Sequence, residues 1–593
     1  MSRIRSSAPR GSIFESVENI KVPQSRHDLS YGNKVSMRMG ELIPFYIEET
    51  SPGQIMDIRA GVFGRIMPLV TPIMQDINVE LRWFYCPYRI LWENFKDFAT
   101  GVGEHDWPSI ALPTESKGDD RMKPGSLYDY FGVDVDNIQE SQDYVPLIDA
   151  MPFRAYYYIY NEYFRDENLQ SELDFDVDKD GISGMEWDEV NKVYVDWKKD
   201  YFTSALPWTQ RGAMAQFVGD VFLKSEANRG HQRLVQYSDP DGYVGLNGES
   251  DLERRTNGES GWDEIFLRPS APDPNLDGVF GASYIEFDAD NQQATVSQFI
   301  KSFLDPNGTL AVAFDIQQLR MANAVQAFFE RSARVGNRYS EYILGMYGVR
   351  VADYTLQRPE YLGGGVMPFS VSEVLQYEQA QLDSNGDPYD ASTPQGNLAG
   401  IGKVSGAFMI NKPHYCSEDG LIIGLMYVRP VASYVNGTRK MMLTGVGVKG
   451  QNGIDDIVVR DRFERLYNPF FEHLGEEGVF GYELATTSTA IERFGDHMTG
   501  RDPQNKAIFG YQSRYAYRKY RNNEIHGLMR GDLLYWHLGR SFDVTPSLNS
   551  SFLMCQPSDR IFAVQDGSEQ FMFDIYNKVD AVLPMSAYSI PRL

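Results

Sequence analysis

Basic and aromatic side chains alternate in residues 514–521, which read Arg-Tyr-Ala-Tyr-Arg-Lys-Tyr-Arg. Lysine and arginine can follow a flexible phosphate backbone while bases stack on tyrosine rings, without any reading of the base sequence. We therefore predict a contact with single-stranded DNA, carried by Arg514, Tyr517, Arg518, Lys519 and Arg521. The same cations could instead bind carboxylates of neighbouring subunits, since the chain contains 82 Asp and Glu. The sequence supports the two interpretations about equally.

The first 40 residues form a second basic region, with seven Lys and Arg against three Asp and Glu. A basic chain terminus can make an electrostatic contact with a nucleic acid. We expect Arg3, Arg5 and Arg10 to contact the same DNA, with a contact to neighbouring subunits as the alternative.

Residues 176–181 read Asp-Val-Asp-Lys-Asp-Gly, which matches the first half of a calcium-binding loop. Such a loop needs a bidentate glutamate at its twelfth position, and Trp187 stands there. We therefore predict an acidic turn in contact with solvent and no cofactor, with calcium as a weakly supported alternative.

The sequence holds no recognisable catalytic constellation. It lacks the nucleophile-elbow, zinc-protease and phosphate-loop motifs, and its eight histidines are scattered singly. Cys86, Cys416 and Cys555 lie too far apart in sequence for a disulfide framework or a metal knuckle. We predict that the protein is not an enzyme.

Charge is distributed unevenly along the chain, whose formal net charge is −26. So acidic a chain cannot coat nucleic acid over its whole surface, because phosphate binding depends on Lys and Arg. Residues 213–313 hold sixteen Asp and Glu against seven Lys and Arg, in a stretch rich in Gly, Asn and Pro. The contrast with the basic first 40 residues favours a shell with one face toward a genome and the other toward water.

The longest apolar stretches have the length of a strand and fall short of the roughly 20 residues that a membrane helix requires. The first residues are basic and polar and do not resemble a secretory signal. Together with the cysteine usage, these features predict assembly in a reducing cytoplasm without membrane insertion.

Apolar and polar residues alternate at residues 77–83, the pattern of a half-buried strand. Strands from both ends of a chain are typical of an antiparallel sandwich with Greek-key or jelly-roll connections. Helices are few: an amphipathic one is predicted over residues 315–334, and a tyrosine-rich one, buried on most sides, over residues 152–166. Further strands are predicted at residues 54–70, 403–410, 421–428, 560–564 and 570–576.

Aromatic residues are numerous, with 36 Tyr, 34 Phe and 8 Trp. The strands of a jelly roll account for only about 50 residues, so most of the chain must lie in long loops, which seldom order themselves. We therefore expect neighbouring subunits to cover the surplus aromatic surface in an obligate closed oligomer.

Several long, aromatic-rich blocks stand out in the chain: GELIPFYIEETSPG (40–53), FYCPYRILWENFKDF (84–98), YNEYFRDENLQ (160–170), DYFTSALPWTQRG (200–212), IQQLRMANAVQAFFERSARVGNRYSEY (316–342), RPEYLGG (358–364) and FGYQSRYAYRKYRNNEIHG (509–527). In this order they resemble the major capsid protein of the Microviridae, the small tailless phages with circular single-stranded DNA. The likeness is closest to the gokushovirus-like branch of that family.

The resemblance implies a mainly β protein, an eight-stranded antiparallel jelly roll with very long inserted loops and a few helices. It implies that sixty copies assemble into a T=1 icosahedral capsid around the genome. It also implies scaffold, DNA-binding and pilot virion proteins as partners, a host cell-surface receptor, and a place in the virion. Members of this branch carry an insertion that projects as a trimeric knob at the threefold axes, where host contact is suspected.

In this chain residues 213–313 occupy the place of that insertion. The expected organisation is a basic arm over residues 1–40 and a first part of the jelly roll over residues 41–212. The surface insertion over residues 213–313 and the remainder of the jelly roll over residues 314–593 would follow.

A carbohydrate-active β-sandwich, either a glycoside hydrolase or an adhesin, is the alternative function. It would explain the acidic charge and the many aromatic rings. It leaves the basic ends and the ordered blocks unexplained, and the sequence alone cannot nominate the two catalytic carboxylates, whose separation is a spatial property.

Overall fold

A computed structural model describes most of the chain, with gaps between the described ranges. The chain divides into two compact units, one made of residues 1–209 and 335–593 and the other of residues 210–334. The first unit holds a sandwich of two antiparallel sheets. The described ranges are 22–113, 120–135, 146–208, 220–223, 232–234, 310–313, 316–375, 398–435, 482–485, 509–513, 520–542, 546–565 and 569–587.

The first sheet has the strand order β1-β19-β4-β14-β13, with β2 paired to β19 and β15 paired to β4. Its central strands come from opposite ends of the chain, as the sequence predicts. The strands are β1 (Ser25–Asp28), β2 (Tyr31–Met37), β4 (Ile55–Ile66), β13 (Ser370–Leu375), β14 (Leu398–Met409), β15 (His414–Tyr415) and β19 (Phe571–Leu583).

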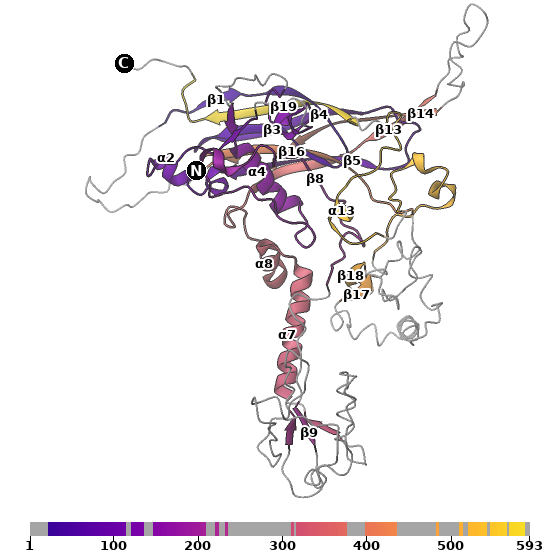
Figure 1. The fold of residues 1–593 in the computed structure, drawn as a ribbon. Helices are drawn as coiled ribbons and strands as arrows, with labels where there is room; N and C mark the ends of the chain where they lie inside the picture. The colour runs from indigo at the N-terminus through magenta and orange to yellow at the C-terminus, as the bar shows by residue number, and fades with distance from the viewer. Residues whose placement is uncertain are drawn as a thin grey trace, which may run out of the picture. The chain divides into compact units, whose positions relative to one another are not determined.

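The second sheet has the strand order β12-β5-β16-β3-β8. The strands are β3 (Glu41–Thr50), β5 (Ile77–Pro87), β8 (Val193–Tyr194), β12 (Glu360–Pro368) and β16 (Gly420–Pro430). Figure 1 shows the first sheet, the second sheet and helix α4 stacked in that order.

The inner faces of the two sheets meet in one hydrophobic core, which includes Ile58 and Ile575 from the first sheet and Trp83 and Met426 from the second. Along β19 every second side chain is buried in this core and the next one is exposed. The predicted mainly β class and antiparallel sandwich are confirmed, and the two strand orders are compatible with the predicted jelly roll.

A layer of short helices and loops covers the outer face of the second sheet and forms a second hydrophobic core with it. Tyr128, Phe153 and Tyr156 are buried there, so much of the aromatic surface that we expected neighbouring subunits to cover lies inside the chain itself. The layer contains α1 (Tyr88–Leu91), α2 (Phe95–Thr100), β6 (Ser109–Ala111), η2 (Asp120–Met122), α3 (Leu127–Tyr130), β7 (Leu147–Asp149), α4 (Met151–Ile159), η3 (Tyr160–Phe164) and η4 (Gly181–Gly184).

Both predicted helices are confirmed: α7 spans Ile316–Val335, and α4 continues into the π-helical turn η3. The predicted strand at residues 560–564 is wrong, since Phe562 there makes only an isolated bridge to Leu69. Residues 25–37, within the expected basic arm, form β1 and β2. No helix among the described residues is both long and apolar enough to span a bilayer.

The remaining elements are short and do not belong to the sandwich. The second unit contains a three-stranded sheet of β9 (Asp220–Leu223), β10 (Gln232–Leu234) and β11 (Leu310–Ala313). The first unit also contains α8 (Tyr339–Tyr347), β17 (Tyr482–Ala485), β18 (Gly510–Ser513), η5 (Gly527–Arg530), η6 (Leu534–Trp536) and α13 (Ser550–Leu553).

Candidate functional site

Four of the sequence blocks meet in the first unit, in a polar region that we call the junction. It comprises residues 160–170, 196–204, 337–342 and 353–364. The chain leaves the first unit after residue 209 and returns to it at residue 335, so the junction holds both chain ends between which residues 210–334 are inserted.

Residues 160–170 form the centre of the junction. The π-helical turn η3 ends where the backbone N–H of Arg165 donates to the carbonyl of Tyr160 at 2.9 Å. Such turns interrupt a regular helix and are frequent at functional sites. Buried Asn161 fixes the turn, because its amide donates to the carbonyl of Leu173 at 2.7 Å and its Oδ1 accepts from the Leu173 N–H at 3.1 Å.

Arg338 ties the returning chain to this centre. Its Nη2 donates to the carbonyls of Asn161 and Arg165 at 2.9 and 2.8 Å, and its Nε lies 2.7 Å from Glu167 Oε1. Burial raises the pKa of Glu167, and the charge of Arg338 opposes that rise. The neighbouring Asn337 adds a hydrogen bond of 2.6 Å to Asn168. The planar guanidinium group suits such contacts because it holds its five donors in a fixed fork, which the single ammonium of lysine lacks.

Arg358 ties residues 353–364 to the rest of the junction. Its Nε and Nη2 donate to Asp353 Oδ1 at 2.8 and 2.7 Å, and its Nη1 donates to Ser340 Oγ at 2.9 Å. Its guanidinium also lies over the ring of Tyr163, 5.1 Å from the centroid. Glu162 Oε2 is 3.9 Å away. The blocks at residues 160–170 and 316–342 are therefore joined to the RPEYLGG block through one side chain.

Asp200 organises the departing chain. Its Oδ1 accepts from the backbone N–H groups of Phe202 and Thr203 at 2.9 and 2.8 Å, and its Oδ2 accepts from the Tyr434 hydroxyl at 2.6 Å. The turn inserts Phe202 into a third small core, where its ring lies 4.9 Å from that of Tyr434 and 6.3 Å from that of Phe509.

Two contacts join the departing chain to residues 160–170. Gln170 Nε2 donates to Asp196 Oδ1 at 2.8 Å, and Lys199 pairs with Asp166. Burial raises the pKa of Asp196 to about 6, although Lys199 and the Gln170 hydrogen bond act in the opposite direction. The junction contains no activated nucleophile, so its chemistry is that of a scaffold that fixes backbone positions.

Of the predicted DNA-contacting residues, only Arg521 lies within the described part of the chain. Arg3, Arg5, Arg10, Arg514, Tyr517, Arg518 and Lys519 lie outside the described residues. Arg521 is described and exposed, next to Tyr520, whose side chain is also exposed. Their role in DNA binding stays a prediction.

The aspartate-rich string at residues 176–181 is a hydrogen-bonded turn. Asp180 Oδ1 accepts from Trp92 Nε1 at 2.7 Å and from Asn94 at 3.0 Å, and its Oδ2 lies 2.7 Å from His105 Nδ1. Asp176 pairs with Lys179 at 2.8 Å. Within the described ranges, no group of three or more His, Cys, Asp or Glu is arranged to hold a metal ion.

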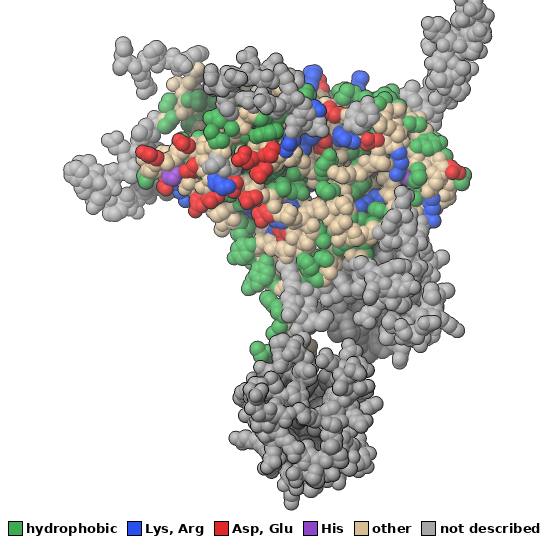
Figure 2. Space-filling model, viewed as in Figure 1, with side chains coloured by type: hydrophobic (Ala, Val, Ile, Leu, Met, Phe, Trp, Pro, Cys, Tyr) green, Lys and Arg blue, Asp and Glu red, His purple; other side chains and the backbone are tan. Residues whose placement is uncertain are grey.

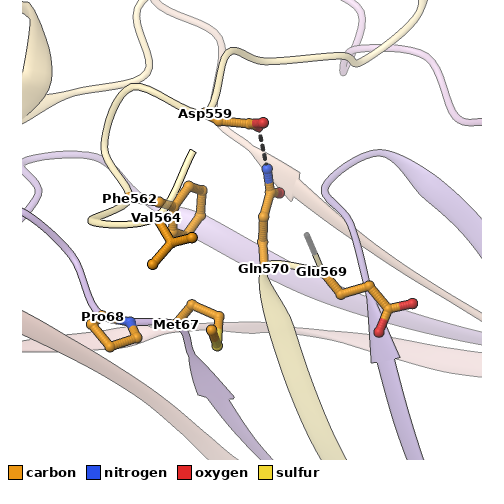
Figure 3. A pocket seen from close by; sticks show the side chains of 7 residues that line it. All are labelled: Met67, Pro68, Asp559, Phe562, Val564, Glu569 and Gln570. Atoms are coloured by element: carbon orange, nitrogen blue, oxygen red, sulfur yellow. Dashed lines mark hydrogen bonds between the residues drawn. The ribbon is translucent and has the colours of Figure 1, made fainter. Parts of the chain in front are cut away.

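Two hollows in the described surface differ in size and lining. Figure 3 shows the smaller, of about 10 Å³, where Gln570 donates to Asp559 beside Met67 and Phe562. That volume holds about one water molecule. The larger, of about 430 Å³, is open, and its Glu418 is paired with Arg89 at 2.8 Å. Because the ion pair and hydrogen bond to Arg89 lower the pKa of Glu418, this carboxylate is unsuited to act as a general acid.

The blocks are recognisable in the sequence, but the contacts that their polar side chains make are not. Arg338, Arg358 and Asp200 lie inside them, yet their partners are distant in sequence or are backbone carbonyls, which leave no sequence signal. The usable signal was indirect: arginines, asparagines and acids interleaved with aromatic rings in blocks that flank one long acidic stretch.

Comparisons with known proteins agree with this arrangement. A family model described as capsid protein (F protein) matches residues 15–593. The chain is 30% identical to capsid protein VP1 of Chlamydia phage 1, 28% to that of Bdellovibrio phage phiMH2K and 27% to that of Spiroplasma virus 4. Each match covers 98% of this chain and 97% of the relative.

Proposed function

The chain belongs to the capsid protein (F protein) family, and on that premise we propose that sixty copies of it build a T=1 icosahedral shell around a circular single-stranded DNA genome. Its resemblance to the gokushovirus-like major capsid proteins is confirmed, and its role is that of a structural capsid protein of a phage virion. The observation that carries the proposal is the family match over nearly the whole chain.

The family and the three relatives are structural proteins and not enzymes, so the alternative of a glycoside hydrolase is set aside. The closed oligomer follows from the capsid role, which requires the protein to assemble with copies of itself. The number of copies and the shell symmetry remain part of the proposal.

We further propose that the insertion at residues 213–313 serves host attachment. Its acidic, turn-rich composition and its place between two clamped chain ends support this role. The junction would let such a segment vary in sequence without disturbing the sandwich, because Arg338, Asn337 and Asp200 fix the backbone on both sides of it.

The genome contact is proposed to involve the basic residues named from the sequence. Arg3, Arg5, Arg10, Arg514, Arg518, Lys519 and Arg521 would neutralise phosphates, and bases would stack on Tyr517. The remaining partners, namely scaffold, DNA-binding and pilot proteins and a host receptor, follow from the family resemblance alone.

The assembly proposal is tested by producing the full chain together with the other virion proteins of its phage and imaging the product by electron microscopy. We expect closed icosahedral particles that contain DNA. A variant that lacks residues 230–300, within the insertion, should still form particles but should no longer adsorb to host cells.

Arg338→Ala is the companion variant, because it leaves the insertion in place and breaks the clamp. We expect it to lower particle yield, whereas Arg350→Ala, an exposed arginine outside the junction, should not. A stable monomer that never assembles, with all partners supplied, would contradict the capsid proposal. Unfolding of the deletion variant would contradict the surface role of the insertion.

A further inference from the structure

The outer face of the first sheet is exposed to solvent and carries cations and aromatic rings. We call it the open face. Two carboxylates on it are already paired, Asp57 with Arg59 at 2.8 Å and Asp574 with Lys34 at 3.3 Å. We define the open face by the exposed side chains of Arg59, Phe63, Arg65, Lys403, Tyr576 and Lys578. They alternate with core residues along β4, β14 and β19, so all six point away from the sandwich.

Like charges lie directly opposite each other on this face. The register places Lys403 opposite Arg65 and Lys578 opposite Arg59. Such cross-strand pairs destabilise a sheet. Arg59 is balanced by Asp57 at 2.8 Å, but no ion pair of Arg65, Lys403 or Lys578 occurs within the described part of the chain. These cations face each other although the whole protein has a net charge of −26. An anionic partner bound to the open face would remove the repulsion between them.

Exposed aromatic rings lie between the two cation pairs. Phe63 and Tyr576 are 42% and 56% exposed. Tyr576 stands between Gly61 and Gly32 on the adjacent strands, and a Cβ added at Gly32 would meet nothing within 4 Å. The ring therefore has free space beside it. Arg59 and Arg65 are six residues apart on one strand, about 20 Å, which leaves room for a few nucleotides between the cation pairs.

We propose that the open face binds single-stranded nucleic acid. Bases stack on Phe63 and Tyr576, and phosphates are neutralised by Arg65, Lys403 and Lys578. Exposed rings select unpaired bases, because bases within a duplex are already stacked on one another. The inference deepens the proposed function and rests on it, since the bound strand would be the packaged genome.

The charge on the opposite side of the sandwich points the same way. Residues 88–199, most of which cover the second sheet, contain 25 Asp and Glu against 11 Lys and Arg, a net charge of −14. On the face seen in Figure 2, acidic side chains gather over the part of the molecule that α2 and α4 occupy in Figure 1. A polyanion is repelled there and attracted to the open face.

The test measures binding of a labelled oligothymidylate to the purified full-length protein by fluorescence anisotropy over a series of salt concentrations. In the triple variant Arg65→Gln, Lys403→Gln, Lys578→Gln, the slope of log affinity against log salt should fall by about 2, since each lost phosphate contact removes about 0.7. In the double variant Phe63→Thr, Tyr576→Thr, affinity should fall about fivefold or more per ring with the slope unchanged. Threonine keeps the strand propensity of these positions.

The matched control is Lys96→Gln, Arg350→Gln, Lys412→Gln, which removes the same charge from exposed positions outside the open face. It should leave both affinity and slope unchanged. An equal loss in the control would mean diffuse attraction and would overturn the proposal, as would a wild-type protein that does not bind the probe. A triple variant that binds DNA normally but forms no particles would show that the face joins two copies of the chain instead.

Particle formation, followed by electron microscopy in the same variants, separates the two proposals. Wild-type particles without DNA binding by the open face would leave the capsid function standing and refute this inference. DNA binding by the open face without any particles would support this inference and contradict the capsid function.

Discussion

The two sheets bury their inner faces in the same core but differ in their outer faces. On the second sheet, Phe84, Leu421 and Leu425 are at most 1% exposed beneath the helical layer. On the first sheet, Phe63 and Tyr576 lie open to solvent. A strand covered on both faces tends to be apolar throughout, whereas a strand covered on one face alternates. The strand at Gly420–Pro430 shows the first pattern and Phe571–Leu583 the second.

The difference shows where this protein can meet partners. The covered face is complete within one chain, because its rings pack on each other and its buried Glu80 is paired with Arg429. The open face presents rings without a covering layer, and its Arg65, Lys403 and Lys578 form no ion pair within the described part of the chain. A capsid subunit needs both kinds of surface, one that keeps its shape and one that is left for assembly or for the genome.

The largest expected effect on stability comes from a substitution in the layer that covers the second sheet. Phe153 is buried in the helical layer, with its ring 4.7 Å from that of Phe131 and 5.1 Å from that of Tyr128. Phe153→Ala should lower the free energy of unfolding by about 3–5 kcal/mol, the usual loss for a buried phenylalanine. Phe63→Ala on the open face should lower it by less than about 1 kcal/mol. Urea unfolding of both variants checks the contrast, and equal losses would mean that the open face is packed in solution.

The second prediction compares ion pairs on the two sides. Glu80 is buried, with its oxygens 2.6 Å from Arg429 and from the Tyr427 hydroxyl. Burial alone would raise the pKa of Glu80, but Arg429, Tyr427 and Arg82 outweigh it and hold the pKa below its ordinary value. Glu80→Gln should therefore cost about 3 kcal/mol at neutral pH, since it leaves the largely buried Arg429 without its carboxylate partner.

The control for Glu80 is Asp574→Asn, which breaks the exposed pair with Lys34 at 3.3 Å and should not change stability measurably. Because the folded pKa of Glu80 is lowered, its contribution is present above the unfolded value of 4.5 and is lost as pH falls. The difference between Glu80→Gln and wild type should therefore shrink in strong acid. A difference independent of pH would contradict the electrostatic explanation.

The smallest effect is a gain in stability. Asp196 has a folded pKa of about 6 against an ordinary value of 3.8, so protonation favours the folded state. The stability that protonated Asp196 contributes is fully present below pH 3.8, its ordinary pKa, and is lost as the pH rises through about 6. Asp196→Asn should raise stability at neutral pH by on the order of 2 kcal/mol and change it little at about pH 4. Melting temperatures at the two pH values check this, and a loss at neutral pH would mean that the charge itself holds Lys199 and the junction in place.

Most of the sandwich was predictable because strand periodicity is a local property. Residues 77–83, 421–428 and 570–576 gave strands where they were expected, and the helix over residues 316–335 ended within a residue of its prediction. The failure at residues 560–564 has a physical cause. That segment is as apolar as a strand, but Arg560 donates to the carbonyls of Leu534, His537 and Gly539 and holds it in a turn.

The candidate site was less predictable, because its contacts join residues far apart in the chain. Arg338 is 171 or more positions from Glu167 and the backbone carbonyls that it binds, and no local pattern marks a carbonyl as its acceptor. The basic-aromatic string at residues 514–521 was conspicuous in the sequence. The cations of the open face were not, since Arg65, Lys403 and Lys578 come from three distant segments.

The sequence by itself determined the class of the protein, its strands and the uneven distribution of its charge, since each of these depends on residue type and short-range order. Only the tertiary structure decided which sheet face is covered and which stays open. The covering layer and the cation pairs arise from strand pairing across hundreds of residues, as where β4 lies between β14 and β19. Side chains with the same local pattern become core or surface according to what packs on them.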